Sequence, residues 1–283
     1  MANPTTGEAL SSVGDWLAHL GDIEKVAAEL TLAHWLGVER TRIIGFPDTL
    51  VPACLHPQIL TWAKALRQGV PLAYLTGQHG FWDMTLEVDT SVLVPRPETE
   101  LLVEETLQIV RHSPSSDRAR KLLDLGTGSG AIAIALSREL PTWQVTGVDN
   151  QADSLTLAKR NAASFNAPIR FVLSDWFSQL DDQWNIILGN PPYIAPDDPH
   201  LPGLQAEPRH ALVADEEGLA DIRHIAQTAP SFLQPGGWLM LEHGYDQGAQ
   251  VRALFVGNGF EDVASIMDLG GHERVTRGRF GHE

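Results

Sequence analysis

From Lys121 onward, short apolar runs of strand length alternate with longer segments that have helical periodicity. This pattern is typical of a doubly wound α/β fold, in which helices cover both faces of a mostly parallel sheet. Two last runs flank Gly270-Gly271 and predict an antiparallel hairpin at the sheet edge. The expected strands are Lys121–Leu125, Val145–Val148, Ile169–Leu173, Trp184–Leu188, Trp238–Glu242, Phe260–Asp268 and Arg274–Phe280, and the expected helices are Ala131–Glu139, Ser154–Ser164, Leu219–Phe232 and Gly248–Asn258.

The preceding part of the chain has a different pattern. Residues 1–80 repeat apolar positions at helical spacing, so we expect a small N-terminal helical bundle, which could serve as a docking surface for a substrate. Its expected core positions are Trp16, Leu17, Leu20, Val26, Leu30, Leu32, Trp35 and Leu36. Residues 81–93 alternate with period two and predict a β-hairpin linker that turns at Thr90-Ser91. The second domain is then 94–283.

Composition limits the class of protein. The chain has 283 residues, of which 43% are hydrophobic, and its single cysteine, Cys54, allows no internal disulfide. We find no apolar run of membrane-spanning length and no secretory leader, and expect a soluble, monomeric, cytoplasmic protein. The formal net charge of −16 opposes binding to nucleic acid. Small basic clusters, at Arg118, Arg120 and Lys121 and within 274–279, are more typical of solvated faces.

A glycine-rich loop joins the first strand of this domain to its helix. It contains Gly126, Thr127, Gly128, Ser129 and Gly130, and glycines there let the backbone turn sharply and let a ligand approach closely. Enzymes that bind NAD, FAD or S-adenosylmethionine all use such loops. The spacing fits the methyltransferase version better than the dinucleotide fingerprint, but it does not decide between them alone.

The ends of the next two strands add polar and aromatic groups. Asp149 follows the second strand and can accept hydrogen bonds from ribose hydroxyls, although it could instead cap the next helix. After the third strand, Asp175 can accept from an adenine amino group and Trp176 can cover the ring, unless this tryptophan is a core residue. These positions predict a nucleoside pocket.

The fourth strand ends in Asn190-Pro191-Pro192-Tyr193. Two prolines make this turn stiff and non-helical. The Asn190 side-chain oxygen and the Pro191 carbonyl can converge on one –NH2 group, and Tyr193 offers a flat face for a planar group. The alternative is an ordinary proline-rich turn. Upstream, residues 95–100 (Pro-Arg-Pro-Glu-Thr-Glu) either close over a cofactor or cap the following helix through Glu98 or Thr99.

Taken with the glycine loop, the Asn-Pro-Pro-Tyr turn makes the chain similar to the peptide chain release factor glutamine N(5)-methyltransferases. Further segments that carry this resemblance are Pro95–Glu100, Ser174–Phe177, Glu207-Pro208, Ala211-Leu212, Leu241–Gly244 and Glu273-Arg274. The resemblance implies a class I methyltransferase sheet. It also implies that S-adenosyl-L-methionine is the donor, that S-adenosyl-L-homocysteine is the product, and that the substrate is the glutamine of the Gly-Gly-Gln loop in class 1 release factors.

The resemblance also assigns roles to individual residues. Gly126 to Gly130, Asp149, Trp176 and Asn190 match cofactor positions of the family, and Asn190 to Tyr193 match its substrate turn, with Asn190, Pro191 and Tyr193 in the catalytic step. No metal is expected, because the eleven histidines form no ligand motif. Two rival readings are a DNA or RNA amino-methyltransferase, which can carry the same turn, and a non-enzymatic adenosine-binding module, which does not need it.

Overall fold

The computed structural model describes residues 11–112 and 120–281. The chain separates into two compact units, Met1–Thr76 and Gly77–Glu283. Arg118 and most of the polar segment before the first parallel strand lie outside the described residues. Across the described part of the chain, the helices are too short or too polar to cross a bilayer.

The first unit is helical, as the periodicity predicts. Its helices are α1 (Val13–His19), α2 (Lys25–Leu36), α3 (Arg40–Gly45), η1 (Ala53–Leu55), α4 (His56–Arg67) and α5 (Leu72–Thr76). Gly37 ends α2 in a left-handed conformation with φ +62°, where a side chain is disfavoured. Trp16, Leu20 and Leu32 are fully buried in its core. The expectation that Val26 and Leu30 are core residues is wrong, because both are 37% exposed on the outer face of α2.

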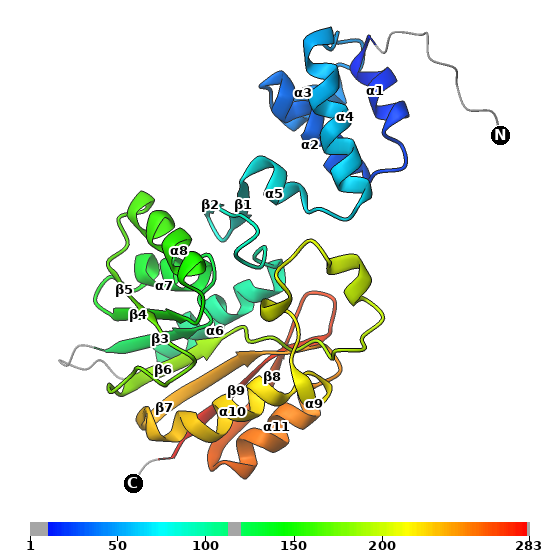
Figure 1. Cartoon of the computed structure of the whole chain (residues 1–283). Coiled ribbons are helices and arrows are strands. Elements are labelled where there is room, and N and C mark those ends of the chain that lie inside the picture. Colours follow the sequence, from blue (N-terminus) through cyan, green and yellow to red (C-terminus); the bar gives the residue numbers. More distant parts are fainter. Residues whose placement is uncertain (1–10, 113–119, 282–283) are drawn as a thin grey trace. The chain divides into compact units, whose positions relative to one another are not determined.

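The second unit contains a seven-stranded sheet with the order β5-β4-β3-β6-β7-β9-β8. Its strands are β3 (Lys121–Leu125), β4 (Gln144–Asp149), β5 (Ile169–Leu173), β6 (Trp184–Gly189), β7 (Leu233–Glu242), β8 (Phe260–Met267) and β9 (Glu273–Phe280). The first five are parallel, and β9 runs antiparallel to both β7 and β8. The predicted α/β class and the C-terminal hairpin are both confirmed (Figure 1).

Helices cover the two faces of this sheet (Figure 1). The helices of this unit are η2 (Pro97–Thr99), α6 (Glu100–His112), α7 (Ala131–Glu139), α8 (Ala152–Ser164), η3 (Leu201–Leu204), η4 (Arg209–Ala211), α9 (Asp215–Gly218), α10 (Ala220–Thr228), η5 (Ala229–Ser231) and α11 (Gly248–Gly257). Successive strand residues point to opposite faces, so Leu122 joins the core under α6 and α7, and Leu123 joins the core under α10 and α11. Both faces are therefore apolar, as a buried parallel sheet requires.

The hairpin before this sheet lies earlier than the sequence suggests. It is formed by β1 (Gln78–Phe81) and β2 (Met84–Glu87), so the chain turns at Trp82-Asp83 and not at Thr90-Ser91. Trp82 adopts φ +57°, which non-glycine residues rarely do. The turn has no glycine or asparagine to mark it, and its geometry is held from outside, because the Glu100 carboxylate accepts the Trp82 N–H at 2.7 Å.

Candidate functional site

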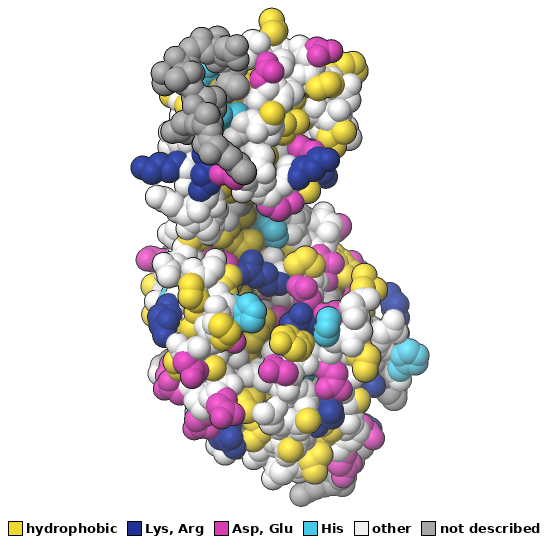
Figure 2. All heavy atoms as spheres, turned by 90° about the vertical axis from the view of Figure 1, so that its right-hand side faces the viewer, with side chains coloured by type: hydrophobic (Ala, Val, Ile, Leu, Met, Phe, Trp, Pro, Cys, Tyr) yellow, Lys and Arg dark blue, Asp and Glu magenta, His cyan; other side chains and the backbone are white. Residues whose placement is uncertain are grey.

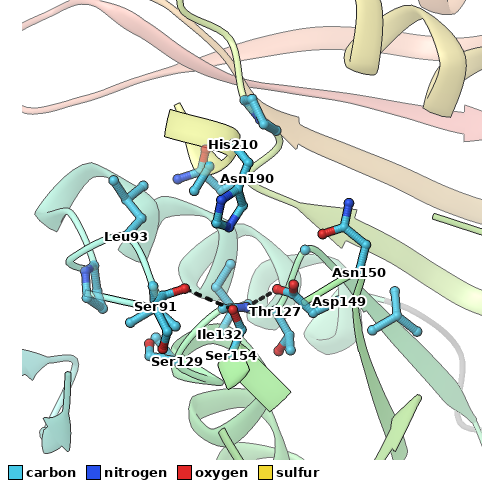
Figure 3. Close-up of a pocket in the computed structure, with 18 of the residues that line it drawn as sticks. Ser91, Leu93, Thr127, Ser129, Ile132, Asp149, Asn150, Ser154, Asn190 and His210 are labelled. Carbon is cyan, nitrogen blue, oxygen red and sulfur yellow. Dashed lines mark hydrogen bonds between the residues drawn. The ribbon is translucent and has the colours of Figure 1, made fainter. Parts of the chain in front are cut away.

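The carboxyl ends of β3, β4, β5 and β6 border a cavity of about 200 Å³. Figure 3 shows Asn190 and His210 on one side of this cavity, Asp149 and Thr127 on another, and Ser129 with Ser154 opposite Asn190. The predicted residues that line it are Gly126, Thr127, Gly128, Ser129, Asp149, Asp175, Trp176, Asn190 and Pro192. Parallel strands end at one edge of a sheet, and this edge collects the residues that the sequence singled out.

The glycine loop forms one wall through its backbone. Gly126 and Gly128 have φ values of +68° and +53°, and the nearest atom to a side chain built on Gly126 is a Trp176 ring carbon at 3.6 Å. Thr127 anchors the loop, since its N–H donates to the Val148 carbonyl at 2.8 Å and its hydroxyl donates to Asp124 at 2.6 Å. A side chain added at Gly126 would fill the space beside Trp176. A ligand that fits closely against the loop needs this space to be empty.

Gly130 lies outside the residues that line the cavity. A side chain built there would meet Ile134 at 3.1 Å and Ala158 at 3.3 Å. The packing of α7 against α8 therefore accounts for glycine at this position, and direct contact with a cofactor stays a prediction.

Asp149 is fixed by the backbone around it. One carboxylate oxygen accepts the Gly128 N–H at 3.0 Å and the other accepts the Gln151 N–H at 2.9 Å. Burial raises the pKa of Asp149 and these hydrogen bonds oppose that rise. Each carboxylate oxygen can accept a further hydrogen bond, so the side chain can hold two hydroxyl groups at the cavity wall.

Trp176 and two carboxylates form the wall at the end of β5. Trp176 is partly buried and adopts φ +45°, a strained conformation for a tryptophan. Its side chain hydrogen-bonds to Asp221, whose pKa is raised by burial. Asp175 also lines the cavity and is exposed. Asp221 and His210 were not expected from the sequence, because both come from helical segments far from any strand end.

The turn after β6 separates two cavities. Asn190 lines both the cavity described above and a second one of about 340 Å³. Pro192 lines the first and Tyr193 the second, whereas Pro191 is buried and lines neither. A carboxamide in a wall shared by two cavities can contact groups bound in each of them.

Buried polar groups support Asn190 from behind. Its amide nitrogen donates to the Thr99 hydroxyl at 3.2 Å, and Thr99 donates to Glu242 at 2.7 Å. The Tyr193 hydroxyl donates to the other oxygen of Glu242 at 3.2 Å. Burial raises the pKa of Glu242 to about 7 and also raises the pKa of Tyr193. Glu242 lies in a segment that carries the family resemblance but was assigned no role from the sequence, although a carboxylate at the end of an apolar strand is the signal that identified Asp149.

The backbone of the same turn is also held. The Gln247 side chain donates to the Tyr193 carbonyl at 3.0 Å. Glu216, Glu217 and Gly218 all have positive φ, and a side chain at Gly218 would lie 2.1 Å from that carbonyl oxygen. Only glycine allows the chain to approach Tyr193 this closely.

Within the segment 95–100, Pro95 and Thr99 line the first cavity and Arg96 lines the second, and the N-terminus of η2 has no side-chain cap. Arg96 pairs with Glu207, which is 6% exposed and also accepts the Val94 N–H at 3.2 Å. Thr99 binds Glu242, as described above. Within the described residues, no group of three or more His, Cys, Asp or Glu side chains is arranged to hold a metal ion.

Comparison with known proteins assigns the chain. A family model described as a methyltransferase small domain matches residues 99–202, and one described as a PrmC N-terminal domain matches residues 8–77. A release factor glutamine methyltransferase from Vibrio cholerae is 42% identical over 98% of this chain and 97% of its own length. The chain belongs to the release factor glutamine methyltransferase family. A second member, from Salmonella typhimurium, is 45% identical over 89% of this chain and 91% of its own length.

Solved structures share the fold of this family at low sequence identity. A methyltransferase from Pyrococcus furiosus superimposes with a TM-score of 0.52 at 18% identity, and covers 78% of this chain and 98% of its own. A 16S rRNA N2 methyltransferase from T. thermophilus, solved with AdoMet and guanosine, has a TM-score of 0.52 at 20% identity and covers 72% of this chain and 49% of its own. These similarities establish the methyltransferase fold of the second unit.

Proposed function

We propose that this protein transfers a methyl group from S-adenosyl-L-methionine to the side-chain amide nitrogen of the glutamine in the Gly-Gly-Gln loop of class 1 peptide chain release factors. S-adenosyl-L-homocysteine is the other product. The observation that carries the proposal is the position of Asn190 in the wall between two cavities. The family relationship supports the choice of substrate.

The first cavity fits a nucleoside with a charged tail. Asp149 holds the ribose hydroxyls, because its two oxygens face a cavity and keep unused lone pairs. Trp176 covers the adenine ring, and Asp175 accepts from the adenine amino group. The loop from Gly126 to Ser129 lies along the rest of the ligand, where the absence of side chains at 126 and 128 permits close approach. When bound, the cofactor supplies an electrophilic methyl group on a sulfonium.

The turn at 190–193 activates the amide by orienting it. An amide nitrogen is a weak nucleophile because its lone pair is delocalised into the carbonyl. Pro191 lines neither cavity, but its main-chain carbonyl belongs to the same turn, and we propose that this carbonyl and the Asn190 side-chain oxygen accept the two N–H bonds. This places the lone pair toward the first cavity and favours positive charge on nitrogen as the new bond forms. Tyr193, in the second cavity, holds the plane of the amide. The proton leaves after transfer, so no dedicated base is required.

We propose a protein substrate and no direct contact with nucleic acid. The net charge is −16, and on the face shown in Figure 2 the Lys and Arg side chains are interspersed with Asp and Glu. Such a surface repels a polyphosphate backbone. A monomer is sufficient, since the proposed donor and acceptor residues come from one chain.

The helical unit is proposed to bind the body of the release factor. Its residues Ile44, Phe46 and Leu50 lie within seven positions of one another and are 54%, 58% and 70% exposed. These exposed apolar side chains, which are close in sequence, are the proposed contact residues. Replacing Phe46 and Leu50 by serine should raise the KM for release factor and leave the Kd for the donor unchanged, as measured by steady-state kinetics and calorimetry.

The overall proposal is tested with labelled S-adenosylmethionine. The purified protein is incubated in parallel with a class 1 release factor and with duplex DNA, and the label is located by peptide mass spectrometry. Label on the loop glutamine supports the proposal, whereas label only on DNA supports an amino-methyltransferase of nucleic acid. Donor binding with no transfer to either substrate would favour a non-catalytic adenosine-binding module.

A further inference from the structure

Behind Asn190, three side chains from separate elements form one hydrogen-bonded chain. Thr99 lies in η2, Glu242 ends β7, and Tyr193 follows β6. Thr99 is 4% exposed and Glu242 is 1% exposed. Buried polar groups of this kind must satisfy one another, so the direction in which each hydroxyl donates is constrained.

The direction of this chain determines how the Asn190 amide is turned. An ionised Glu242 only accepts hydrogen bonds, so the single Thr99 proton goes to it, at 2.7 Å. The Thr99 oxygen can then only accept from Asn190, which turns the –NH2 group toward Thr99 at 3.2 Å. The amide oxygen consequently faces away from Thr99. In the described part of the chain this oxygen has no hydrogen-bond partner, which leaves it available for a substrate N–H.

We propose that Glu242, acting through Thr99, is a positioning residue that keeps the Asn190 side-chain oxygen directed at the substrate amide. This inference rests on the proposed function, because it explains how one acceptor of the methylated amide is set. The oxygen and the –NH2 group of an asparagine side chain are nearly the same size. A substrate –NH2 group can donate to the oxygen, whereas the asparagine –NH2 group repels it. Thr99 and Glu242 are the groups that distinguish these two ends.

Protonation of Glu242 removes this distinction. The groups around Glu242 are Thr99 and Glu98 from the segment before α6, Tyr193 from the turn after β6, and Arg274 from β9. Burial and Glu98 raise the pKa of Glu242. The hydrogen bonds from Thr99 and Tyr193 and the charge of Arg274 lower it, and the resulting pKa is about 7. When the proton of Glu242 lies on the oxygen that faces Thr99, Glu242 donates to Thr99, whose own proton is then free to donate to the Asn190 oxygen. The Asn190 side-chain amide then rotates by half a turn, so that its –NH2 group faces the –NH2 group of the substrate and cannot accept a hydrogen bond from it.

Variants of the full-length protein test the inference. Replacing Thr99 by valine keeps the shape and removes the hydroxyl, and we expect kcat for release factor methylation at saturating donor to fall about tenfold or more. T99S keeps the hydroxyl and should retain most of the activity. E242Q, which can donate to Thr99, should lower kcat at all pH values and abolish the decline of kcat as pH falls through about 7.

Thr106→Val is the matched control. Thr106 is a fully buried threonine of α6 whose hydroxyl donates to the Leu102 carbonyl at 2.7 Å and takes no part in the site. It should keep wild-type kcat and pH profile. Wild-type kcat and pH profiles in both T99V and E242Q would overturn the inference while leaving the proposed function intact.

A readout independent of activity separates the two proposals. NMR of the protein without substrate reports on the side-chain N–H signals of Asn190. These signals should shift with pH, with a midpoint at about pH 7, and E242Q should remove this shift. Absence of any shift in the wild-type protein would refute the inference. Failure of the wild-type protein to methylate a release factor, with the Asn190 shift present, would refute the proposed function alone.

Discussion

The groups on the two sides of Asn190, toward the donor cavity and toward the substrate amide, differ in kind. On the donor side, the cavity is lined by a glycine loop and by an Asp149 whose carboxylate is fixed by two main-chain N–H groups. On the amide side, the supporting groups are side chains, namely Thr99, Glu242 and Tyr193, joined by hydrogen bonds. Backbone can fit the constant parts of a cofactor, whereas side chains can set the direction of a single acceptor. Substitutions on the first side should therefore affect binding, and those on the second should affect rate.

The largest expected effect is on the amide side. Asn190→Ala removes the proposed acceptor of the substrate N–H. It should raise the activation free energy of methyl transfer by about 2–4 kcal/mol, which lowers the rate roughly 30- to 1,000-fold. The Kd for donor should change little, because the Asp149 and glycine-loop contacts remain. Rapid-mixing transfer of label to release factor measures the rate. Loss of donor affinity as large as the loss of rate would show that the two sides are not separable.

The reverse separation is expected for Asp149→Ala. Loss of a carboxylate that accepts two hydroxyl groups should weaken donor binding by about 1.5–3 kcal/mol, or roughly 10- to 150-fold in Kd. At saturating donor, kcat should stay close to that of the wild-type protein. Isothermal titration calorimetry with S-adenosylhomocysteine and steady-state kinetics provide the two values. A fall in kcat with unchanged Kd would contradict the assignment.

Each side also contains one buried carboxyl group, Asp124 or Glu242, and burial raises the pKa of each to about 7. Because the ordinary values are 3.8 and 4.5, the folded state holds more protons than the unfolded state between those values and about 7. The free energy of unfolding should therefore decrease as pH rises through this window, by up to about 1.4 kcal/mol per pH unit for each group.

Replacing either carboxyl group by an amide should reduce the pH dependence of the free energy of unfolding. D124N and E242Q should each reduce the slope by a similar amount, and the double variant should reduce it further, as measured by urea unfolding from about pH 5 to about pH 8. Only E242Q should also alter the pH profile of catalysis. If D124N changed the pH profile of catalysis as much as E242Q does, the proposed difference between the donor side and the amide side would be wrong.

The smallest expected effect is that of Trp176→Ala. It removes a stacking surface worth about 1–3 kcal/mol for a base, and it leaves the φ of +45° equally unfavourable, because alanine also has a Cβ atom. Donor affinity should therefore fall several-fold, and the free energy of unfolding in the absence of donor should also fall, because Trp176 packs against the core under α10 and α11. Calorimetry and urea unfolding of the same variant test both parts.

The sequence predicted the lining of the first cavity more completely than the groups behind Asn190. Asp149 and Trp176 could be found because strand ends and glycine loops are local signals, and parallel strands place these ends together. The contact between Thr99 and Glu242 joins positions 143 apart in the chain, and no local pattern indicates it. The hairpin turn at Trp82-Asp83 was missed for a similar reason, since a distant glutamate and not a turn residue holds it.

The measurement that tests the account most directly is transfer of labelled methyl to a class 1 release factor by the wild-type protein and by Asn190→Ala, with donor saturating and the modified residue located by mass spectrometry. The account predicts one methyl group on the loop glutamine with the wild-type protein, and a rate lower by at least about 30-fold with the variant at unchanged donor affinity. Equal rates for the two proteins, or methylation at another residue, would contradict it.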